Sequence, residues 1–338
     1  MFDPKILARL AASYQKPMKK LAAIEKELNN RFTELTEPIR ALILSVAASE
    51  PLLLIGPPGT AKSRLIRAFC GLIGLLHEND PGRDHPDYFE YLLTPFTEPG
   101  ELFGYYDISE ARKGRLVRVD IGMMQHAQVV YLDEVFNGSS AILNSILAFM
   151  NERIFHDRGE RKRVKMNCLF GATNRIPETP ELRAIFDRFV LRCRIENIDA
   201  KPGAVSKLLE KGWQETYTAR KQVLDGQDLL QELDNFRKAI NTYTEKGELL
   251  PQTETPIHNR LAQWIHYARL YDLSEMSNRR LVKMVHIMLV HRVYEAAISQ
   301  KPGSEISLRN KELQLMYRYF LDRADEESVQ KMERTLKQ

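Results

Sequence analysis

The chain has 338 residues, of which 43% are hydrophobic and 28% are charged, as in a globular protein with room for two domains. The formal net charge of +4 is too small to indicate a nucleic-acid or membrane partner by itself. No apolar run approaches the roughly 20 residues of a membrane helix, and residues 1–5 do not begin a signal peptide. We therefore expect a cytoplasmic protein.

The chain has three cysteines, Cys70, Cys168 and Cys193. Their count is odd and none forms a Cys-x-x-Cys pair, while Cys168 and Cys193 lie in predicted strands. These features predict buried free thiols, which fit a reducing compartment.

Three helices are predicted before the first strand. Residues 3–31 have apolar residues at helical spacing, and we expect Pro17 to divide this segment into two helices. A third helix is predicted from Thr36, a candidate N-cap, with Pro38 in its first turn.

Five apolar segments are predicted as strands, with helices between several of them. They are residues 51–55, 88–93, 129–133, 168–173 and 190–195. The clearest helix between them covers residues 139–151, with Ser139 or Ser140 as its cap. Apolar strands that alternate with helices indicate a parallel sheet covered on both faces. Ligands of such sheets bind at the carboxyl ends of the strands.

The segment after the first predicted strand reads as a phosphate-binding loop that opens a helix. Main-chain N–H groups of such a loop can hold phosphate oxygens, and the lysine can reach the β- and γ-phosphates while the serine hydroxyl binds Mg²⁺. The residue before the lysine is usually glycine; because this position can be helical, a methyl group should be tolerated there. The alternative is a turn that only caps a helix. The loop comprises Gly56, Pro57, Pro58, Gly59, Thr60, Ala61, Lys62 and Ser63.

Polar residues end two of the later strands. Asp133 and Glu134 close the apolar run 129–132, and such acids need a cationic partner. We expect Asp133 to bind Mg²⁺ and Glu134 to orient and deprotonate the attacking water; the alternative is a pair of helix-capping acids. Asn174 follows the strand at 168–173 and can hold the same water, or it can be an ordinary turn residue.

After about residue 200 only helical periodicity remains, which predicts a second, all-helical domain. Residues 246–256 read as a loop within it. The predicted fold class is therefore α/β: a P-loop core with a five-stranded parallel sheet, followed by an all-helical lid. The predicted division is 1–32 for N-terminal helices, 33–200 for the nucleotide-binding domain, and 201–338 for the lid domain and tail.

In this order the motifs resemble those of AAA+ ATPases, and among them the MoxR family, particularly its RavA-like members in the helix-2-insert branch. This family commonly has Ala at the position of Ala61. The motifs that carry the resemblance are Gly-Pro-Pro-Gly-Thr-Ala-Lys-Ser (56–63), Glu-Leu-Phe-Gly (101–104), Tyr-Leu-Asp-Glu-Val (131–135), Ile-Leu-Asn-Ser-Ile-Leu-Ala-Phe-Met-Asn-Glu-Arg (142–153), Gly-Ala-Thr-Asn (171–174), Phe-Asp-Arg-Phe (186–189) and Ser-Asn-Arg-Arg (277–280).

The resemblance implies roles for individual residues. Asn174 would be sensor 1, and Arg188 would be the arginine finger that reaches the γ-phosphate of a neighbouring subunit, where it offsets developing charge. Arg279 would be sensor 2, with Arg280 as the alternative. The alternative for Arg188 is an ion pair with Asp187 or Glu181. The alternative for Arg279 and Arg280 is that they lie at the solvated start of a helix.

The resemblance also implies a function and partners. It implies an ATP- and Mg²⁺-dependent hydrolase that forms a ring, usually a hexamer, and remodels a partner protein in the manner of a chaperone. The usual partner has a von Willebrand factor A domain. The alternatives are a nucleic-acid-stimulated motor, helicase-like or restriction-associated, and a subunit resembling the magnesium chelatase motor.

Two basic segments motivate the nucleic-acid alternative. Residues 105–122 and 155–166 are predicted insert loops, the second a hairpin that turns at Gly159. In the family such inserts face the central channel or one surface of the ring, where they could grip an acidic protein segment or nucleic acid. Charge that only keeps the loops solvated is the alternative. The basic residues are Arg112, Lys113, Arg115, Arg118, Arg158, Arg161, Lys162, Arg163 and Lys165.

Overall fold

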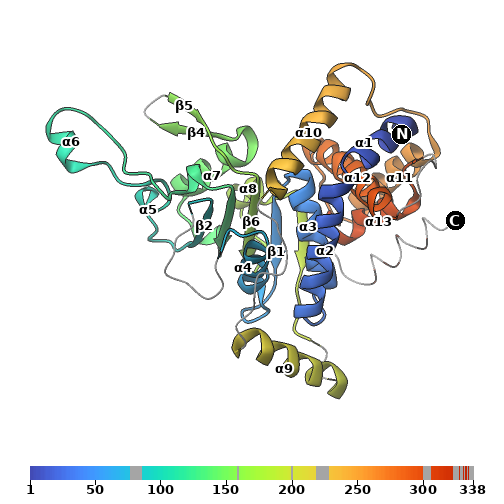
Figure 1. Cartoon of the computed structure of the whole chain (residues 1–338), viewed down its shortest axis with the longest axis horizontal. Helices are drawn as coiled ribbons and strands as arrows, with labels where there is room; N and C mark the ends of the chain where they lie inside the picture. The colour runs from blue at the N-terminus through green and yellow to red at the C-terminus, as the bar shows by residue number, and fades with distance from the viewer. Residues whose placement is uncertain are drawn as a thin grey trace.

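The computed structural model describes residues 1–76, 86–157, 160–198, 201–217, 228–299 and 306–322, together with Glu327, Gln330, Met332 and Arg334. A five-stranded sheet lies at its centre (Figure 1) and has the strand order β2-β3-β6-β1-β7. Every pairing in it is parallel. The five predicted strands are confirmed as β1 (Leu52–Ile55), β2 (Tyr88–Leu92), β3 (Val129–Asp133), β6 (Cys168–Thr173) and β7 (Leu191–Arg194).

The two faces of the sheet belong to two hydrophobic cores, as the predicted covering on both sides requires. Because successive side chains of a strand point to opposite faces, Leu52 and Leu54 of β1 join one core and Leu53 and Ile55 join the other. All four are buried. The three cysteines are also buried and free, as predicted.

The N-terminal helices are α1 (Pro4–Ser13), α2 (Gln15–Arg31) and α3 (Thr36–Ala48). The first break lies at Tyr14, so Pro17 is in the first turn of α2 rather than at the break. A proline ring clashes with the carbonyl four residues earlier, and the helix is therefore interrupted one turn before it. The expected cap at Thr36 is wrong: Leu35 is the N-cap and makes no side-chain cap bond.

The helices between the strands are α4 (Lys62–Leu72), α5 (Pro99–Phe103), α6 (Ile108–Arg112), α7 (Ser140–Glu152) and α8 (Pro180–Phe186), with short 3-10 helices at Met124–His126 and Val135–Asn137. Ser139 caps α7 as predicted. The segment around α6 and the hairpin of β4 (Ile154–Asp157) and β5 (Glu160–Arg163) project from the sheet on the side away from the N-terminal helices (Figure 1). The expected hairpin turn at Gly159 and the basic residue Arg158 lie outside the described residues.

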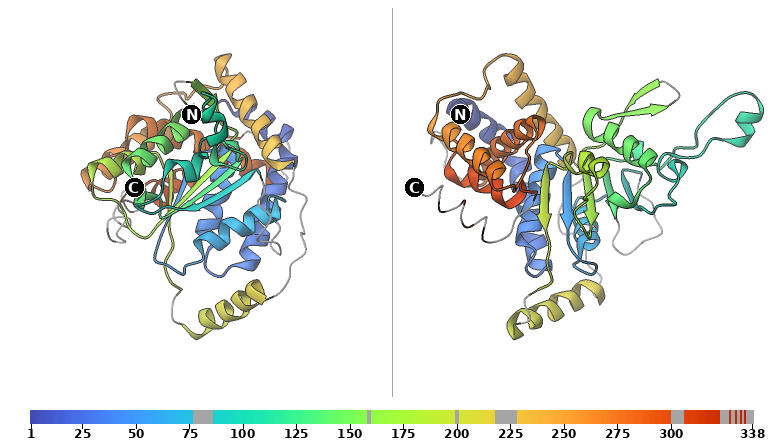
Figure 2. Two further views of the ribbon diagram at one scale, coloured as in Figure 1. Left: turned by 90° about the vertical axis from the view of Figure 1, so that its left-hand side faces the viewer. Right: turned by 180° about the vertical axis from the view of Figure 1, so that it is seen from behind.

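The C-terminal helices are α9 (Pro202–Tyr217), α10 (Leu229–Glu245), α11 (Pro256–Leu270), α12 (Asn278–Ile298) and α13 (Asn310–Tyr319). The described residues beyond β7 contain no strand, as predicted, and α10 and α11 flank the predicted loop. Helices α10–α13 pack beside α1–α3 (Figure 2) and share one core with them, whereas α9 contacts α2 outside this core. The domain limits at residues 33 and 201 stay a prediction. Within the described ranges, no helix combines the length and apolarity needed to cross a membrane.

Candidate functional site

The order of the strands brings the predicted catalytic and nucleotide-binding residues to one edge of the sheet, at the carboxyl ends of the strands. Strands β3, β6 and β1 are neighbours, and the segments that follow them carry Asp133–Glu134, Asn174 and the phosphate-binding loop. Their parallel register places Ile55 beside Thr173, and Gly56 N donates to Thr173 O at 3.0 Å. Segments more than 100 residues apart in the chain therefore meet around the loop.

Lys62 contacts several of these segments. It is 7% exposed, and its Nζ donates to Gly56 O at 2.6 Å, to Pro57 O at 2.8 Å and to Asn174 Oδ1 at 3.4 Å. Burial lowers the pKa of Lys62, while the nearby charges of Asp133 and Glu134 raise it. The ammonium group thus lies near the loop carbonyls, the amide of Asn174 and the two acids.

The loop enters α4 through Ala61, which has φ 63° and ψ 23°. This conformation is left-handed, so the expectation of a helical position is wrong. A residue with a Cβ atom pays roughly 1–2 kcal/mol for such a backbone. The left-handed residue lets the loop curl over the start of α4, where Lys62 and the half-buried Ser63 form the first turn.

Glu134 of the same site also has a left-handed conformation, with φ 48°. Its N–H donates to Asp133 Oδ1 at 3.0 Å. Burial and the charge of Asp133 raise the pKa of Glu134, whereas the charge of Lys62 and a main-chain hydrogen bond from Asn174 lower it. Strained backbone of this kind is common at functional sites, and here it directly follows β3, where Glu134 lies near the charges of Asp133 and Lys62.

A cavity of about 160 Å³ lies beside the loop and extends the site. Gly59 and Thr60 form one wall and Lys211 of α9 another. Lys211 Nζ donates to Asn29 O at 2.9 Å and to Phe32 O at 3.2 Å, which fastens α9 to the end of α2. The sequence identified the wall formed by the phosphate-binding loop but not the others, because these come from three further segments of the chain. The other lining residues include Phe32, Thr33, Asn197, Ile198 and Leu208.

Arg188 lies in a different place, at the turn between α8 and β7. Its Nη1 contacts Asp187 Oδ2 at 3.5 Å and Ala184 O at 3.4 Å, so the ion pair that competes with a finger role is present, although it is long. Burial and the charge of Arg279 lower the pKa of Arg188, and Asp187 opposes them. The two arginines therefore lie close together, and neither lines the cavity beside the phosphate loop.

The structure separates the two candidates for sensor 2. Arg280 is 1% exposed and donates to Asp322 Oδ1 at 2.6 Å and to Phe320 O at 2.5 Å, so its guanidinium is committed inside the lid. Arg279 is exposed at the start of α12. Of the two arginines, Arg279 is therefore the one with an exposed side chain.

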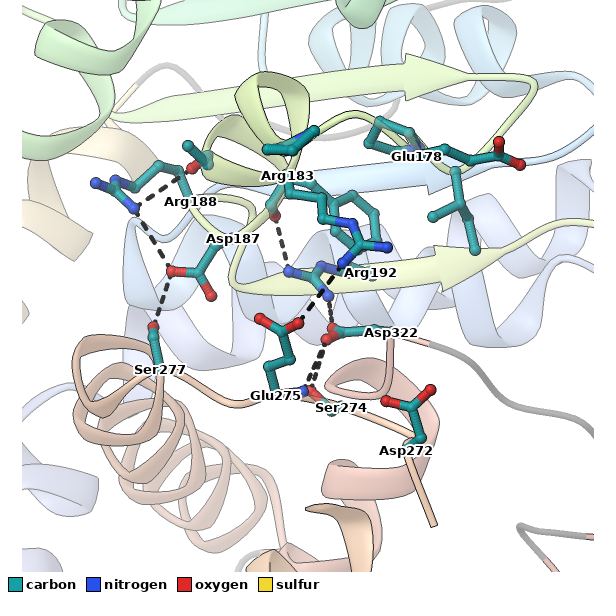
Figure 3. Close-up of a pocket in the computed structure, with 15 residues that line it drawn as sticks. Glu178, Arg183, Asp187, Arg188, Arg192, Asp272, Ser274, Glu275, Ser277 and Asp322 are labelled. Carbon is teal, nitrogen blue, oxygen red and sulfur yellow. Dashed lines mark hydrogen bonds and ion pairs between the residues drawn. The ribbon is translucent and has the colours of Figure 1, made fainter. Parts of the chain in front are cut away.

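Figure 3 shows the surroundings of Arg188. A cavity of about 720 Å³ separates the α8–β7 turn from the loop before α12. Asp187 Oδ2 accepts a hydrogen bond from Ser277 Oγ at 2.8 Å, and Asp322 forms an ion pair with Arg192. Sequence reasoning did not single out this network, although an arginine at position 192 within an apolar strand was a signal of a buried charge.

The two basic inserts carry less unpaired charge than their sequences suggest. Lys113 and Arg115 both pair with Glu110, at 2.8 and 2.6 Å. Arg118 pairs with Asp157 at 3.3 Å and so joins the α6 insert to the hairpin. These acids offset part of the basic rim that would attract a nucleic acid. Lys162 also pairs with Asp157, at 3.3 Å. The other described basic residues of the two inserts are exposed, namely Arg112, Arg161, Arg163 and Lys165.

A parallel sheet with this strand order, a phosphate loop after β1, acids at the end of β3 and a helical C-terminal part define a P-loop core with a lid, the class of AAA+ ATPases. The same fold occurs in a crystal structure described as a "putative ATPase" from Cytophaga hutchinsonii. That match has a TM-score of 0.65 and 14% identity, and it covers 98% of this chain and 96% of the other.

Sequence comparison identifies the family. Residues 19–236 match the family model for the MoxR domain in the MoxR-vWA-beta-propeller ternary systems. The chain therefore belongs to the MoxR family of AAA+ ATPases.

The curated relatives extend beyond the matched region. "Uncharacterized protein MJ0079" of Methanocaldococcus jannaschii is 38% identical over 64% of this chain and 55% of its own length. "Uncharacterized protein MJ0812" of the same organism is 36% identical over 68% and 58%. The "Structural protein ORF618" of Acidianus two-tailed virus is 26% identical over 70% and 36%. The chain thus spans little more than half the length of the first two relatives.

Proposed function

We propose that this chain binds ATP with Mg²⁺ and hydrolyses it to ADP and phosphate. The observation that carries the proposal is the convergence of Lys62, Asn174, Asp133 and Glu134 at the carboxyl edge of β1, β3 and β6. Family membership supports it. The ammonium of Lys62 is held by loop carbonyls, and the β- and γ-phosphates would replace them as its partners.

Glu134 is the proposed general base. Its raised pKa brings the carboxyl closer to neutral pH, where a base is a better proton acceptor. The amide of Asn174 would position the water between Glu134 and the γ-phosphate. The oxygen donors Ser63 and Asp133 suit Mg²⁺, which when bound neutralises phosphate charge.

Arg188 and Arg279 would complete the site of a neighbouring copy in a ring, for which the family commonly uses six subunits. Arg188 already pairs with Asp187 at 3.5 Å, and the γ-phosphate bound by the neighbouring copy would be a further anion within reach of these guanidiniums. Since they lie together and away from the phosphate-loop cavity, we place both on the donating side of the subunit interface. The cavity of about 160 Å³ would take the adenine base.

The proposed cellular role is remodelling of a protein partner. The matched family model describes MoxR domains of systems that also contain a vWA and a β-propeller component. A protein with a von Willebrand factor A domain is therefore the proposed partner, and ATP-driven changes in the ring would act on it.

The test is ATP turnover by the purified chain and by Glu134→Gln. Replacing the base should reduce hydrolysis by about 10²–10⁴-fold while ATP binding, measured with a fluorescent ATP analogue, is retained. Asn137→Gln is a matched control, because Asn137 is exposed just beyond the same strand end. Normal turnover by Glu134→Gln, in a preparation where Lys62→Ala is inactive, would exclude Glu134 as the base.

A further inference from the structure

The turn that carries Arg188 and the helix that carries Arg279 come from separate parts of the fold, and one carboxylate joins them. Asp322 lies just beyond α13. Its Oδ1 accepts from Arg280 Nη1 at 2.6 Å, and its Oδ2 accepts from Ser274 Oγ at 2.9 Å and from Glu275 N at 3.2 Å. The same carboxylate forms an ion pair with Arg192 of β7.

Arg192 fixes the turn on the core side. It is 4% exposed, and its guanidinium lies 3.6 Å from the centre of the Phe186 ring. Its Nη2 donates to Phe186 O at 2.8 Å and its Nε to Phe189 O at 3.1 Å. Arg192 thus holds both ends of the short turn that presents Arg188.

Arg280 fixes the lid side. It is adjacent to Arg279 in the first turn of α12, and burial lowers its pKa to about 9. Burial and the charge of Arg280 also lower the pKa of Arg192. Two buried guanidiniums that repel each other need a shared anion, and Asp322 contacts both.

A second link runs along the outside of the same interface. Asp187, the neighbour of Arg188, accepts the Ser277 Oγ hydrogen bond at 2.8 Å, and Ser277 is the N-cap of α12. The charge of Asp187 also raises the pKa values of Arg192 and Arg280. The turn and α12 are therefore connected on both sides of Arg188, as Figure 3 shows.

We propose that Asp322 is a positioning residue that holds Arg188 and Arg279 as one unit, aimed at the nucleotide of the neighbouring subunit. This inference rests on the proposed ATP hydrolysis between subunits. In this proposal Asp322 acts through its ion pairs with Arg192 and Arg280. A movement of the lid would therefore change the aim of both arginines together.

The test uses two kinds of subunit mixed in one ring. A Glu134→Gln subunit cannot hydrolyse ATP but donates its arginines, whereas an Arg188→Ala subunit binds ATP but donates no finger. Their mixture should be active. Adding Asp322→Asn to the donor should reduce this activity at least tenfold, whereas adding it to the acceptor should leave most of the activity in place.

This asymmetry separates positioning from general structural damage, which would reduce activity in both arrangements. Glu275→Gln in the donor is the matched control, because its side chain is 83% exposed and pairs only distantly with Arg183, at 3.6 Å; it should leave activity unchanged. If Asp322→Asn fails to fold, Asp322→Glu keeps the charge but moves it, and it should lower donor activity several-fold with ATP binding intact.

The outcomes distinguish this inference from the proposed function. Full activity with an Asp322-substituted donor, or equal losses in donor and acceptor for a variant that binds ATP normally, would overturn the positioning role alone. No activity in the mixture of unmodified donor and acceptor, with mixed rings demonstrated, would overturn hydrolysis between subunits and the inference with it.

Discussion

The phosphate-loop face and the Arg188 face are built by different means. On the first, the main chain does most of the positioning: Lys62 is held by two carbonyls, and Ala61 and Glu134 adopt left-handed backbone. On the second, side chains from β7, α12 and the segment after α13 form an ionic network. The geometry of the phosphate-loop face is set once the sheet forms, because the main chain positions its residues. The geometry of the Arg188 face depends on how the lid packs against the core, because ion pairs between them position its residues.

The largest effect on ATP turnover is expected for Arg188→Ala. An arginine finger contributes roughly 10³–10⁵-fold to hydrolysis, so turnover should fall by at least about 10³-fold. ATP affinity of each subunit should stay within a few-fold, because the phosphate-loop face is intact. Steady-state kinetics with a parallel ATP-binding titration measure both. If ATP affinity fell as much as turnover, Arg188 would have to act on the phosphate-loop face of its own subunit, contrary to the proposal.

A smaller effect is expected from Gly56→Ala on the main-chain face. A Cβ atom at Gly56 would lie 2.1 Å from Ile195 O, and the loop would have to move together with the carbonyl that binds Lys62. ATP affinity should fall at least about tenfold, as titration can measure. Gly203→Ala is the control, because a Cβ there meets no atom within 4 Å. Unchanged affinity in Gly56→Ala would contradict a backbone-built site.

The smallest effect concerns the far end of α12, where stability alone should change. Burial would raise the pKa of Glu295, but hydrogen bonds from Lys311 and Arg40 outweigh it and lower the pKa from 4.5 to about 2. A lowered carboxyl pKa stabilises the fold above the unfolded-state value, and this contribution is lost as pH falls from about 4.5 toward 2. Glu295→Gln should therefore lower the free energy of unfolding at pH 7 and lose that difference progressively below pH 4.5.

Denaturant titrations at several pH values measure this difference. ATP turnover at pH 7 should remain close to that of the unmodified chain, because Glu295 lies near the opposite end of α12 from Arg279. A difference in stability that grew on acidification would contradict the assigned ion pairs with Arg40 and Lys311.

The sequence was sufficient to predict the main-chain face. Its five strands are local apolar runs, and the loop, Asp133–Glu134 and Asn174 directly follow three of them, so that parallel pairing alone brings these residues together. The left-handed conformation of Ala61 could not be predicted, because it depends on how the loop closes over α4. The break at Tyr14 was misplaced because a proline acts on the turn before it.

The ionic face was largely hidden from the sequence. Arg188 and Arg279 were found only through the family resemblance. Asp322 lies in a polar segment after α13 that contains no motif. Its importance becomes visible only in the structure, where the lid brings it into contact with Arg192. The choice of Arg279 over Arg280 likewise required the structure, because the two residues are neighbours in the chain. Only their solvent exposure separates them: the Arg280 side chain is 1% exposed and lies in the interior.

The most direct test of hydrolysis between subunits is ATP turnover in mixtures of Arg188→Ala and Glu134→Gln chains. Each variant alone should be nearly inactive. Activity should rise on mixing, be greatest at intermediate ratios and vanish at either extreme. No activity at any ratio, in samples where mixed assemblies are demonstrated, would contradict it.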